Sequence, residues 1–253
     1  MKLCFDSLRV GYKKKQVLEN VSFQVPAGQI TALIGRNGVG KSTVLRCLAG
    51  DKSYWGTIAL DGVDAATMDH NQRAKQVAYL PQDLPRPRVT VEELVAFGRA
   101  PYTPLTGKIS TQDTEKIEKA LADVEITHLR NTFVDALSGG ERKKAFFAMV
   151  LAQDTPVVLL DEPTAHLDAV SRFRFLELVE RICREQGKTF LVVMHDLSDV
   201  LRFADRVVVL HQKQMVFDGT PEEALDQRIP QAYFGIALTG NRETGFAATP
   251  VKE

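Results

Sequence analysis

The eight residues from Gly35 to Ser42 constrain the fold of this chain more than any other segment. Their sequence, GRNGVGKS, fully matches the phosphate-binding pattern GxxxxGK[ST], and it lies between an apolar run at residues 30–34 and a predicted helix at residues 41–49. Glycines let backbone N–H groups close around phosphates, and the N-terminus of the helix adds positive potential. The alternative, a glycine-rich turn without a ligand, is disfavoured by the strand–loop–helix context. The residues predicted to bind a nucleotide here are Gly35, Asn37, Gly38, Gly40, Lys41, Ser42 and Thr43.

Two side chains of this loop and two carboxylates further along the chain have complementary chemistry. We expect Lys41 to contact the β- and γ-phosphates and Ser42 to ligate Mg²⁺ through its hydroxyl. Residues 157–160, VVLL, are typical of a strand covered on both faces, and Asp161 follows at its carboxyl end, where α/β proteins bind ligands. Asp161 would hold the magnesium through water, and Glu162 would be the general base that polarises the attacking water. Without the phosphate-binding loop, the two carboxylates could be a polar pair that merely ends a strand.

Composition excludes several other kinds of protein. The 253 residues include 32 Lys and Arg and 32 Asp and Glu, so the formal net charge is zero, unlike the basic excess of a general nucleic-acid binder. Cys4, Cys47 and Cys183 form no Cys-x-x-Cys pair and indicate neither a disulfide framework nor a zinc site. The N-terminus lacks the apolar region of a signal peptide, and no apolar run approaches the roughly 20 residues of a membrane span. We therefore expect a soluble chain that cannot alone be a channel or a receptor.

Short apolar runs alternate with longer amphipathic stretches, which predicts an α/β fold with a mostly parallel sheet. Residues 57–60 end at Asp61-Gly62, a strong hairpin signal. Together with residues 17–25 and the N-terminal segment, they predict an antiparallel β subdomain beside the parallel sheet. The strands predicted after the first one are residues 77–80, 157–160, 189–194 and 207–210.

The pattern changes between about residue 85 and residue 154. Three helical stretches follow there, near residues 91–99, 111–123 and 139–153, with no convincing strand between them, which predicts a helical subdomain inserted into the α/β core. We predict one domain over residues 1–238 and a loosely held tail over residues 239–253, which are rich in Gly, Thr and Ala without periodicity. Cys183 falls on the apolar face of a predicted helix at residues 170–185 and is expected to be a small core residue.

A third motif, LSGGE from Leu137 to Glu141, opens one of the helices of the insertion. Two glycines at a helix N-terminus offer free N–H groups, a second anion site that must face some phosphate. GRNGVGKS, LSGGE and VVLLDE, in this order and together with Gln82 and His195, resemble the nucleotide-binding subunits of ATP-binding-cassette (ABC) transporters over about residues 3–225. The resemblance implies a P-loop NTPase core, ATP and Mg²⁺ as cofactors, and a head-to-tail homodimer. In that dimer each ATP lies between the P-loop of one subunit and Ser138, Gly139 and Gly140 of the other.

The same resemblance implies roles for further side chains. Tyr12 lies where the family stacks an aromatic ring on adenine, although a lone tyrosine is more often just packing. Gln82 would sense magnesium and link to the helical insertion, and His195 would contact the γ-phosphate. Asp168 matches the family's D-loop and is expected at the nucleotide. The predicted catalytic residues are therefore Glu162, His195 and Gln82, and the predicted metal ligands are Ser42, Gln82 and Asp161.

Glu141 departs from the family pattern, in which Gln is commoner. Ser138-x-x-Glu141 is a capping box, so Glu141 can reach back to the backbone N–H of Ser138 and hold the helix end. We expect capping to be its main role. Its charge, close to a partner's phosphate, should weaken nucleotide-driven closure slightly.

Two functions of different class remain open. The first is the energising subunit of a membrane importer, with two transmembrane permease subunits and a periplasmic or extracellular binding protein as partners, no nucleic acid, and a peripheral location on the cytoplasmic face of the inner membrane. The second is a soluble ABC-type ATPase, such as one for iron–sulfur cluster assembly. DEPTAHLD at residues 161–168 favours the importer, as does FGRAPY at residues 97–102, which is similar to an element of iron-siderophore, haem and cobalamin importers. We therefore predict import of an iron chelate or cobalamin, without distinguishing among these cargoes.

Overall fold

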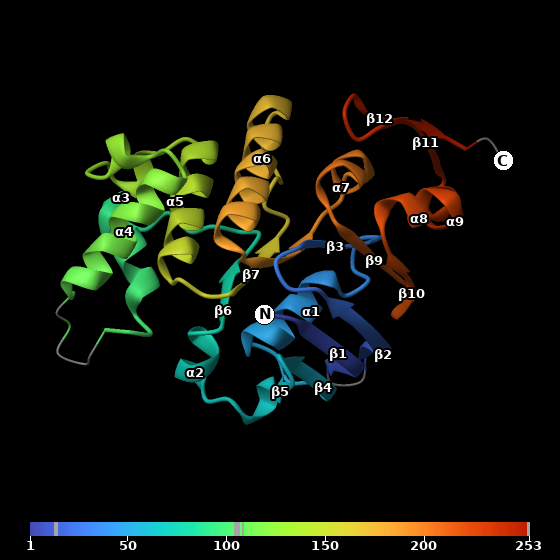
Figure 1. Cartoon of the computed structure of the whole chain (residues 1–253), viewed down its shortest axis with the longest axis horizontal. Coiled ribbons are helices and arrows are strands. Elements are labelled where there is room, and N and C mark those ends of the chain that lie inside the picture. Colours follow the sequence, from blue (N-terminus) through green and yellow to red (C-terminus); the bar gives the residue numbers. More distant parts are fainter. Residues whose placement is uncertain (13–14, 104–106, 108, 252–253) are drawn as a thin grey trace.

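The computed structural model describes residues 1–12, 15–103, 107 and 109–251, and within them three sheets and their covering helices form an α/β architecture (Figure 1). The central sheet has six strands in the order β10-β9-β3-β8-β7-β6. All its neighbours pair in parallel except β9 and β10, so the prediction of a mostly parallel sheet is confirmed. Its strands are β3 Ile30–Gly35, β6 Val77–Leu80, β7 Val157–Asp161, β8 Thr189–Val193, β9 Arg206–His211 and β10 Gln214–Gly219.

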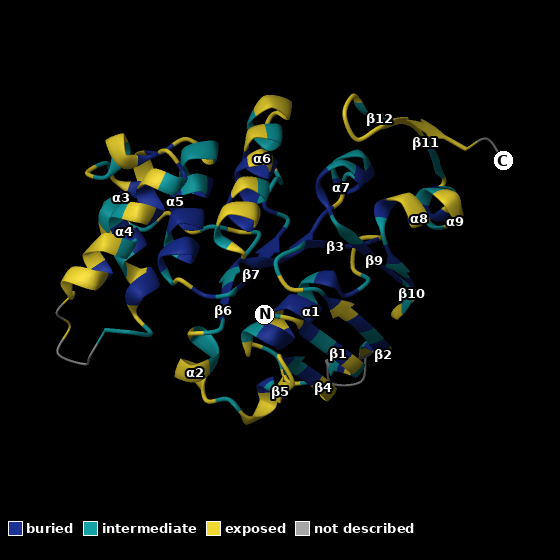
Figure 2. Cartoon of the chain, viewed as in Figure 1, coloured by how far each residue is buried: buried dark blue, intermediate teal, exposed yellow. Residues whose placement is uncertain are grey.

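The central strands are covered on both faces. Every residue of β3, β7 and β8 is buried, as expected for apolar strands in the middle of a parallel sheet (Figure 2). Alternate residues of these strands face two separate cores. One core contains α1 (Lys41–Ala49) and the antiparallel sheet, and the other contains the helices on the opposite face.

The predicted antiparallel subdomain is confirmed as a four-stranded sheet in the order β2-β1-β4-β5. The stacked rings of Phe5 and Phe23, 4.3 Å apart, join its two longest strands, and the side chains behind them pack on α1. This packing holds α1 between the two sheets, with its N-terminus at the carboxyl end of β3. The strands are β1 Leu3–Tyr12, β2 Lys15–Val25, β4 Trp55–Leu60 and β5 Val63–Asp64, followed by α2 His70–Ala74.

Helices occupy the predicted insertion and lie together at one end of the molecule (Figure 1). They are α3 Val91–Ala96, a 3-10 turn at Phe97–Arg99, α4 Thr111–Asp123 and α5 Gly139–Ala152. Each of the three α-helices begins with a capping box, at Thr90, Ser110 and Ser138 respectively. The described residues between 85 and 154 contain only an isolated bridge, Thr90 to Phe133, and no strand.

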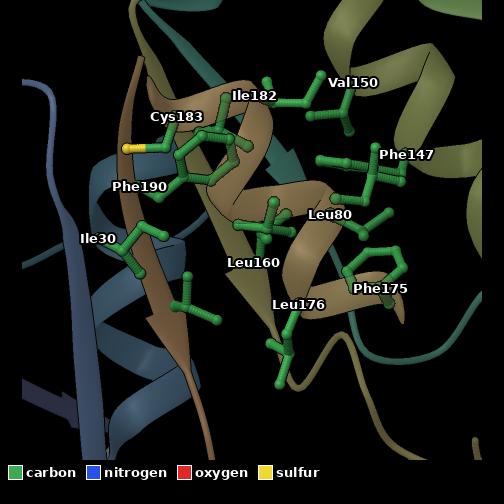
Figure 3. Close-up of a cluster of buried hydrophobic side chains, with 14 of the residues drawn as sticks. Ile30, Leu80, Phe147, Val150, Leu160, Phe175, Leu176, Ile182, Cys183 and Phe190 are labelled. Carbon is green, nitrogen blue, oxygen red and sulfur yellow. The ribbon is translucent and has the colours of Figure 1, made fainter. Parts of the chain in front are cut away.

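One hydrophobic core runs from the insertion into the sheet (Figure 3). Phe147 of α5 lies 5.2 Å, ring to ring, from Phe175 of α6 (Ala169–Gln186), beside Leu160 of β7. Cys183 of α6 is 1% exposed in the same cluster, so its prediction as a core residue is confirmed, and burial raises the pKa of its thiol to about 11. The insertion and the helix that follows β7 therefore share one core.

The C-terminal segment differs from the prediction. After α7 (Leu197–Phe203), α8 (Pro221–Asp226) and α9 (Ile229–Phe234), the chain forms a hairpin of β11 (Ile236–Asn241) and β12 (Gly245–Pro250) where a loosely held tail was expected. Asn241 accepts hydrogen bonds from the next turn's N–H groups, and Arg242 donates to carbonyls at the end of α7. The predicted boundary at residue 238 thus falls inside a strand. Among the described residues, no helix has the length and apolarity that a bilayer crossing requires.

Candidate functional site

The phosphate-binding loop lies at the carboxyl end of β3 and runs directly into α1. Two positions of this loop require glycine. Each has a positive φ, and at each a side chain would collide with a neighbouring strand. A Cβ on Gly35 (φ +152°) would lie 2.3 Å from the carbonyl oxygen of Leu210, and one on Gly40 (φ +112°) would lie 2.6 Å from the side chain of Leu18. The loop therefore sits closely on the adjoining strands, with its N–H groups at the start of α1.

A cavity of about 380 Å³ opens at this loop. It brings together nine of the residues predicted to bind nucleotide, metal or water, and one that was not predicted, Val17. A pocket of this size and polarity at the carboxyl edge of a parallel sheet suits a phosphorylated ligand. The lining residues are Val17, Asn37, Gly38, Gly40, Lys41, Ser42, Thr43, Gln82, Glu162 and His195.

Lys41 is the cation at the floor of this cavity. Lys41 is 5% exposed, and its ammonium group donates to the carbonyl oxygens of Gly35 at 2.8 Å and Arg36 at 3.3 Å. Burial lowers the pKa of Lys41, opposed by the negative charges of Glu162 and Asp161. Gly35 does not line the cavity, but its carbonyl orients the lysine that does.

Ser42 and Asp161 form the candidate magnesium site. The Ser42 hydroxyl donates to Asp161 Oδ1 at 2.8 Å, and the Tyr79 hydroxyl donates to Oδ2 at 3.0 Å. Asp161 is 2% exposed, and this burial raises the pKa of its carboxyl group. A hydroxyl and a buried carboxylate beside a phosphate loop fit Mg²⁺, which takes oxygen ligands and completes its shell with phosphate and water. Among the described residues there is no cluster of three or more His, Cys, Asp or Glu for a metal bound by protein alone.

Glu162 is held between the other two predicted catalytic residues. Gln82 Nε2 donates to Glu162 Oε2 at 2.8 Å, and His195 Nε2 contacts Oε1. Glu162 has φ +48°, a left-handed conformation that non-glycine residues rarely adopt and that is concentrated at functional sites. Three strand ends, those of β6, β7 and β8, thus deliver Gln82, Glu162 and His195 to one wall of the cavity.

The LSGGE motif lies elsewhere in the chain. Ser138 caps α5 with the predicted box: its N–H donates to Glu141 Oε2 at 2.9 Å, and the N–H of Glu141 donates to Ser138 Oγ at 3.3 Å. These hydrogen bonds lower the pKa of Glu141, which confirms the capping role. A Cβ added at Gly139 or Gly140 would meet open space, and neither Ser138 nor the two glycines line the cavity of their own chain.

Asp168, another predicted nucleotide residue, is not among the described residues that line the cavity. Asp168 caps α6, accepting from the N–H groups of Val170 and Ser171 at 3.0 Å each, and hydrogen bonds from Ser171 and the backbone lower its pKa. Tyr12 ends β1, and its side chain lies outside the described residues. These positions remain predictions.

The FGRAPY segment has a clear structural role. A Cβ on Gly98 would lie 2.2 Å from the carbonyl oxygen of Met149, so only glycine lets the segment pack on α5. Arg99 is 4% exposed and donates to Asp113 of α4 at 2.8 Å and to the Ala152 carbonyl of α5 at 2.7 Å. The ring of Tyr102 covers its guanidinium at 4.1 Å. The segment therefore ties the three helices of the insertion together.

Sequence reasoning missed two polar side chains near the site. Tyr79 contacts Asp161, and Lys143 of α5, 6% exposed, donates to the Ala165 carbonyl at 3.1 Å in the loop after Glu162. Tyr79 had no motif to mark it, because only the register of β6 against β7 places it on the same face as Asp161. Lys143 had none, because its partner is distant in sequence.

Comparison with known proteins identifies the relatives of this chain. The family model described as ABC transporter matches residues 18–165. Ferric enterobactin transport ATP-binding protein FepC of Escherichia coli (strain K12) is 39% identical over 91% of this chain and 86% of its own length. Petrobactin import ATP-binding protein FpuC of Bacillus anthracis is 41% identical over 87% and 82%. Iron(3+)-hydroxamate import ATP-binding protein FhuC of Bacillus subtilis (strain 168) is 36% identical over 92% and 88%.

Solved structures agree with the fold. The cbiO1 protein of Clostridium perfringens, part of the ABC transporter complex cbiONQ, superposes with a TM-score of 0.77 at 26% identity and covers 90% of this chain and 94% of its own. An ABC transporter subunit in an inward-facing conformation gives a TM-score of 0.84 over 99% and 98%, and at 24% identity it supports the fold alone. These relatives confirm the predicted P-loop NTPase core and favour the importer over the soluble cluster-assembly alternative.

Proposed function

Because this chain belongs to the ABC transporter family, as an ATP-binding subunit that hydrolyses ATP to drive transport, we propose that it energises a membrane importer of iron chelates. The observation that carries the proposal is the set of groups around Glu162, in which a carboxylate is oriented by Gln82 and His195 at the edge of the phosphate cavity. Such a group is a general base poised for an attacking water.

The proposed reaction is phosphoryl transfer from ATP to water. Glu162 accepts a proton from the water, whose oxygen attacks the γ-phosphorus, and the bond from that phosphorus to the bridging oxygen breaks to give ADP and phosphate. Lys41 and the loop N–H groups bind the phosphates, and His195 contacts the γ-phosphate while it orients Glu162. Ser42 and Asp161 would hold Mg²⁺, with Gln82 close to it, and the bound ion would neutralise charge on the β- and γ-phosphates.

We infer that two copies complete the site. Ser138 and Gly139 at the start of α5 are exposed, and a Cβ at Gly139 or Gly140 would meet open space, so the phosphate of a nucleotide held by a second copy could reach this helix N-terminus. A head-to-tail homodimer would place Ser138, Gly139 and Gly140 of one subunit on the ATP held by the P-loop of the other. Asp168 would approach the same nucleotide from the loop after Glu162, and Tyr12 would stack on the adenine.

The partners follow from the relatives. The curated proteins named above are ATP-binding subunits of transport or import systems, so this chain works with a membrane permease. We propose two permease subunits, a periplasmic or extracellular binding protein that delivers the cargo, and a peripheral position on the cytoplasmic face of the membrane. Ferric enterobactin, petrobactin and iron(3+)-hydroxamate in the names of the relatives support a ferric siderophore over haem or cobalamin.

Reconstitution tests this proposal. The chain should co-purify with a permease encoded beside it, and proteoliposomes containing both should take up a ferric siderophore in the presence of ATP and the binding protein. Parallel assays with haem and cobalamin distinguish the cargoes. Recovery with soluble cluster-assembly proteins, and no ATP-dependent uptake of any of the three, would contradict the importer.

A further inference from the structure

We propose that Tyr79 is a positioning residue for the magnesium site, whose hydroxyl fixes the orientation of the Asp161 carboxylate. This inference rests on the proposed function, because it assigns a residue to the site where Mg²⁺ and ATP would bind. Neither a sequence motif nor a position on the cavity wall points to Tyr79; the geometry of two neighbouring strands does.

The strand register places the two side chains on one face of the sheet. Strands β6 and β7 pair in parallel with Tyr79 opposite Leu159, so Asp161 lies two residues further along β7 on the same face. Val77 and Leu159 belong to the core that contains α1, whereas Ala78 and Leu160 belong to the opposite core. Tyr79 therefore faces α1, the helix that carries Ser42.

Both oxygens of the Asp161 carboxylate accept a hydrogen bond from the protein. Ser42 on α1 donates to Oδ1, and Tyr79 on the neighbouring strand β6 donates to Oδ2. Together the two bonds prevent rotation of the carboxylate group, which is 2% exposed. Groups that hydrogen-bond a metal-binding carboxylate in this way orient its lone pairs, and their loss typically weakens metal binding 10–100-fold.

Tyr79 is itself held as a hydrogen-bond donor. Its hydroxyl is the donor in the 3.0 Å hydrogen bond to Asp161 Oδ2. A side-chain hydrogen bond also links Arg46 of α1 to the phenol. Since an arginine can only donate, it meets the phenolic oxygen and leaves the Tyr79 proton for Asp161. Contacts therefore run from Arg46 through Tyr79 and Asp161 to Ser42, and they connect α1, β6 and β7.

The test is Tyr79→Phe, which removes one oxygen and preserves the ring. EPR titration of Mn²⁺ into protein held in excess over a non-hydrolysable ATP analogue gives the metal dissociation constant in the ternary complex. We expect that constant to rise about 10-fold. The affinity for the analogue in EDTA and the urea midpoint should change little. A residue needed only for folding would change these two quantities rather than the Mn²⁺ dissociation constant.

Tyr54→Phe is the matched control, because the Tyr54 hydroxyl is buried without a hydrogen-bond partner among the described residues. It should leave the Mn²⁺ constant unchanged. Arg46→Met, at an exposed position of α1, should weaken Mn²⁺ in the same direction as Tyr79→Phe but by less. An unchanged Mn²⁺ dissociation constant in Tyr79→Phe overturns this inference and leaves the proposed function standing. A loss of analogue affinity in EDTA as large as the loss of Mn²⁺ affinity has the same consequence. Failure of the unaltered protein to bind the analogue and Mn²⁺ overturns the proposed function itself.

Discussion

At the scale of single residues, Glu162 is the group that we propose as the general base. Its backbone is in the left-handed region, and both of its carboxylate oxygens are engaged, one by Gln82 and the other by His195. This arrangement keeps the carboxylate at the cavity with a fixed orientation. A base that is positioned before substrate arrives needs no reorganisation at the moment of proton transfer.

Glu162→Gln should therefore separate binding from hydrolysis. The amide cannot accept the proton of water, so we expect ATP hydrolysis to fall about 10²–10⁴-fold while ATP binding persists. The trapped nucleotide should accumulate a closed dimer, visible by size-exclusion chromatography with ATP and absent with ADP. A variant that stays monomeric with ATP and hydrolyses it at the normal rate would show that Glu162 is not the base.

Asp199 gives a prediction about pH. It lies on α7, where burial and the negative charge of Asp196 raise its pKa from 3.8 to about 6, although Arg172 Nε is 3.2 Å away. The folded state then binds a proton at Asp199 more tightly than the unfolded state does. The contribution of Asp199 to the free energy of unfolding is therefore most favourable at low pH and falls as pH rises between 3.8 and about 6. Asp199→Asn removes this loss and should raise the free energy of unfolding by about 1–3 kcal/mol at neutral pH.

Urea unfolding of both proteins at pH 4 and pH 8 measures this effect. The difference in unfolding free energy between the variant and the unaltered protein should be larger at pH 8, because at pH 4 most of the penalty on the carboxylate is absent. Equal differences at the two pH values would mean that Asp199 does not titrate in this range. Glu180→Gln, which removes a carboxylate on α6, serves as the control.

At the scale of elements, the FGRAPY segment determines the integrity of the insertion. Arg99 is a buried cation that contacts α4 and α5 at once. Arg99→Met would leave the Asp113 carboxylate buried without its cation, and we expect a loss of about 3–5 kcal/mol in the free energy of unfolding. Arg181→Met is the matched control, since Arg181 pairs with Glu125 at 3.5 Å on the surface, where ion pairs contribute about 0–1 kcal/mol. Equal urea midpoints for the two variants would contradict a stabilising role for the buried contacts of Arg99.

The elements that the sequence predicts are those with a strong local pattern. Apolar runs predict β3, β7 and β8, and the capping box at Ser138 predicts the start of α5, because these signals are contained within a few adjacent residues. The hairpin at the C-terminus escapes prediction because its strands lack alternation and its stability comes from Arg242 and α7. The same reasoning separates the site residues: Lys41, Asp161 and Glu162 follow from motifs, whereas Tyr79 and Lys143 depend on contacts between segments distant in sequence.

At the scale of the whole molecule, we propose that the chain carries two halves of a nucleotide site on different elements. The cavity at the P-loop contains the phosphate-binding and catalytic groups, and the exposed N-terminus of α5 carries Ser138, Gly139 and Gly140. Their separation within one chain, together with open space at both glycines, predicts that each active unit is assembled from two copies. This prediction differs from a site made by one chain in a way that mixing experiments can detect.

The mixing experiment uses two inactive variants. Lys41→Ala removes the phosphate-binding cation, and Gly139→Asp places a negative charge at the N-terminus of α5, where the open space accommodates the side chain and the fold is preserved. Each variant alone should lack ATPase activity because both of its composite sites are damaged. In a heterodimer, however, the intact P-loop of the Gly139→Asp chain faces the intact α5 of the Lys41→Ala chain.

An equal mixture should therefore regain activity, up to about one quarter of the normal rate, because half the dimers are mixed and each mixed dimer has one intact site of two. A double variant that carries both changes in one chain, mixed with the unaltered chain, provides the comparison. Both composite sites of its heterodimers are damaged, so only the quarter of dimers that contain two unaltered chains should be active. If each chain instead built its site alone, the two single variants would stay inactive after mixing, whereas the double-variant mixture would keep half the normal rate.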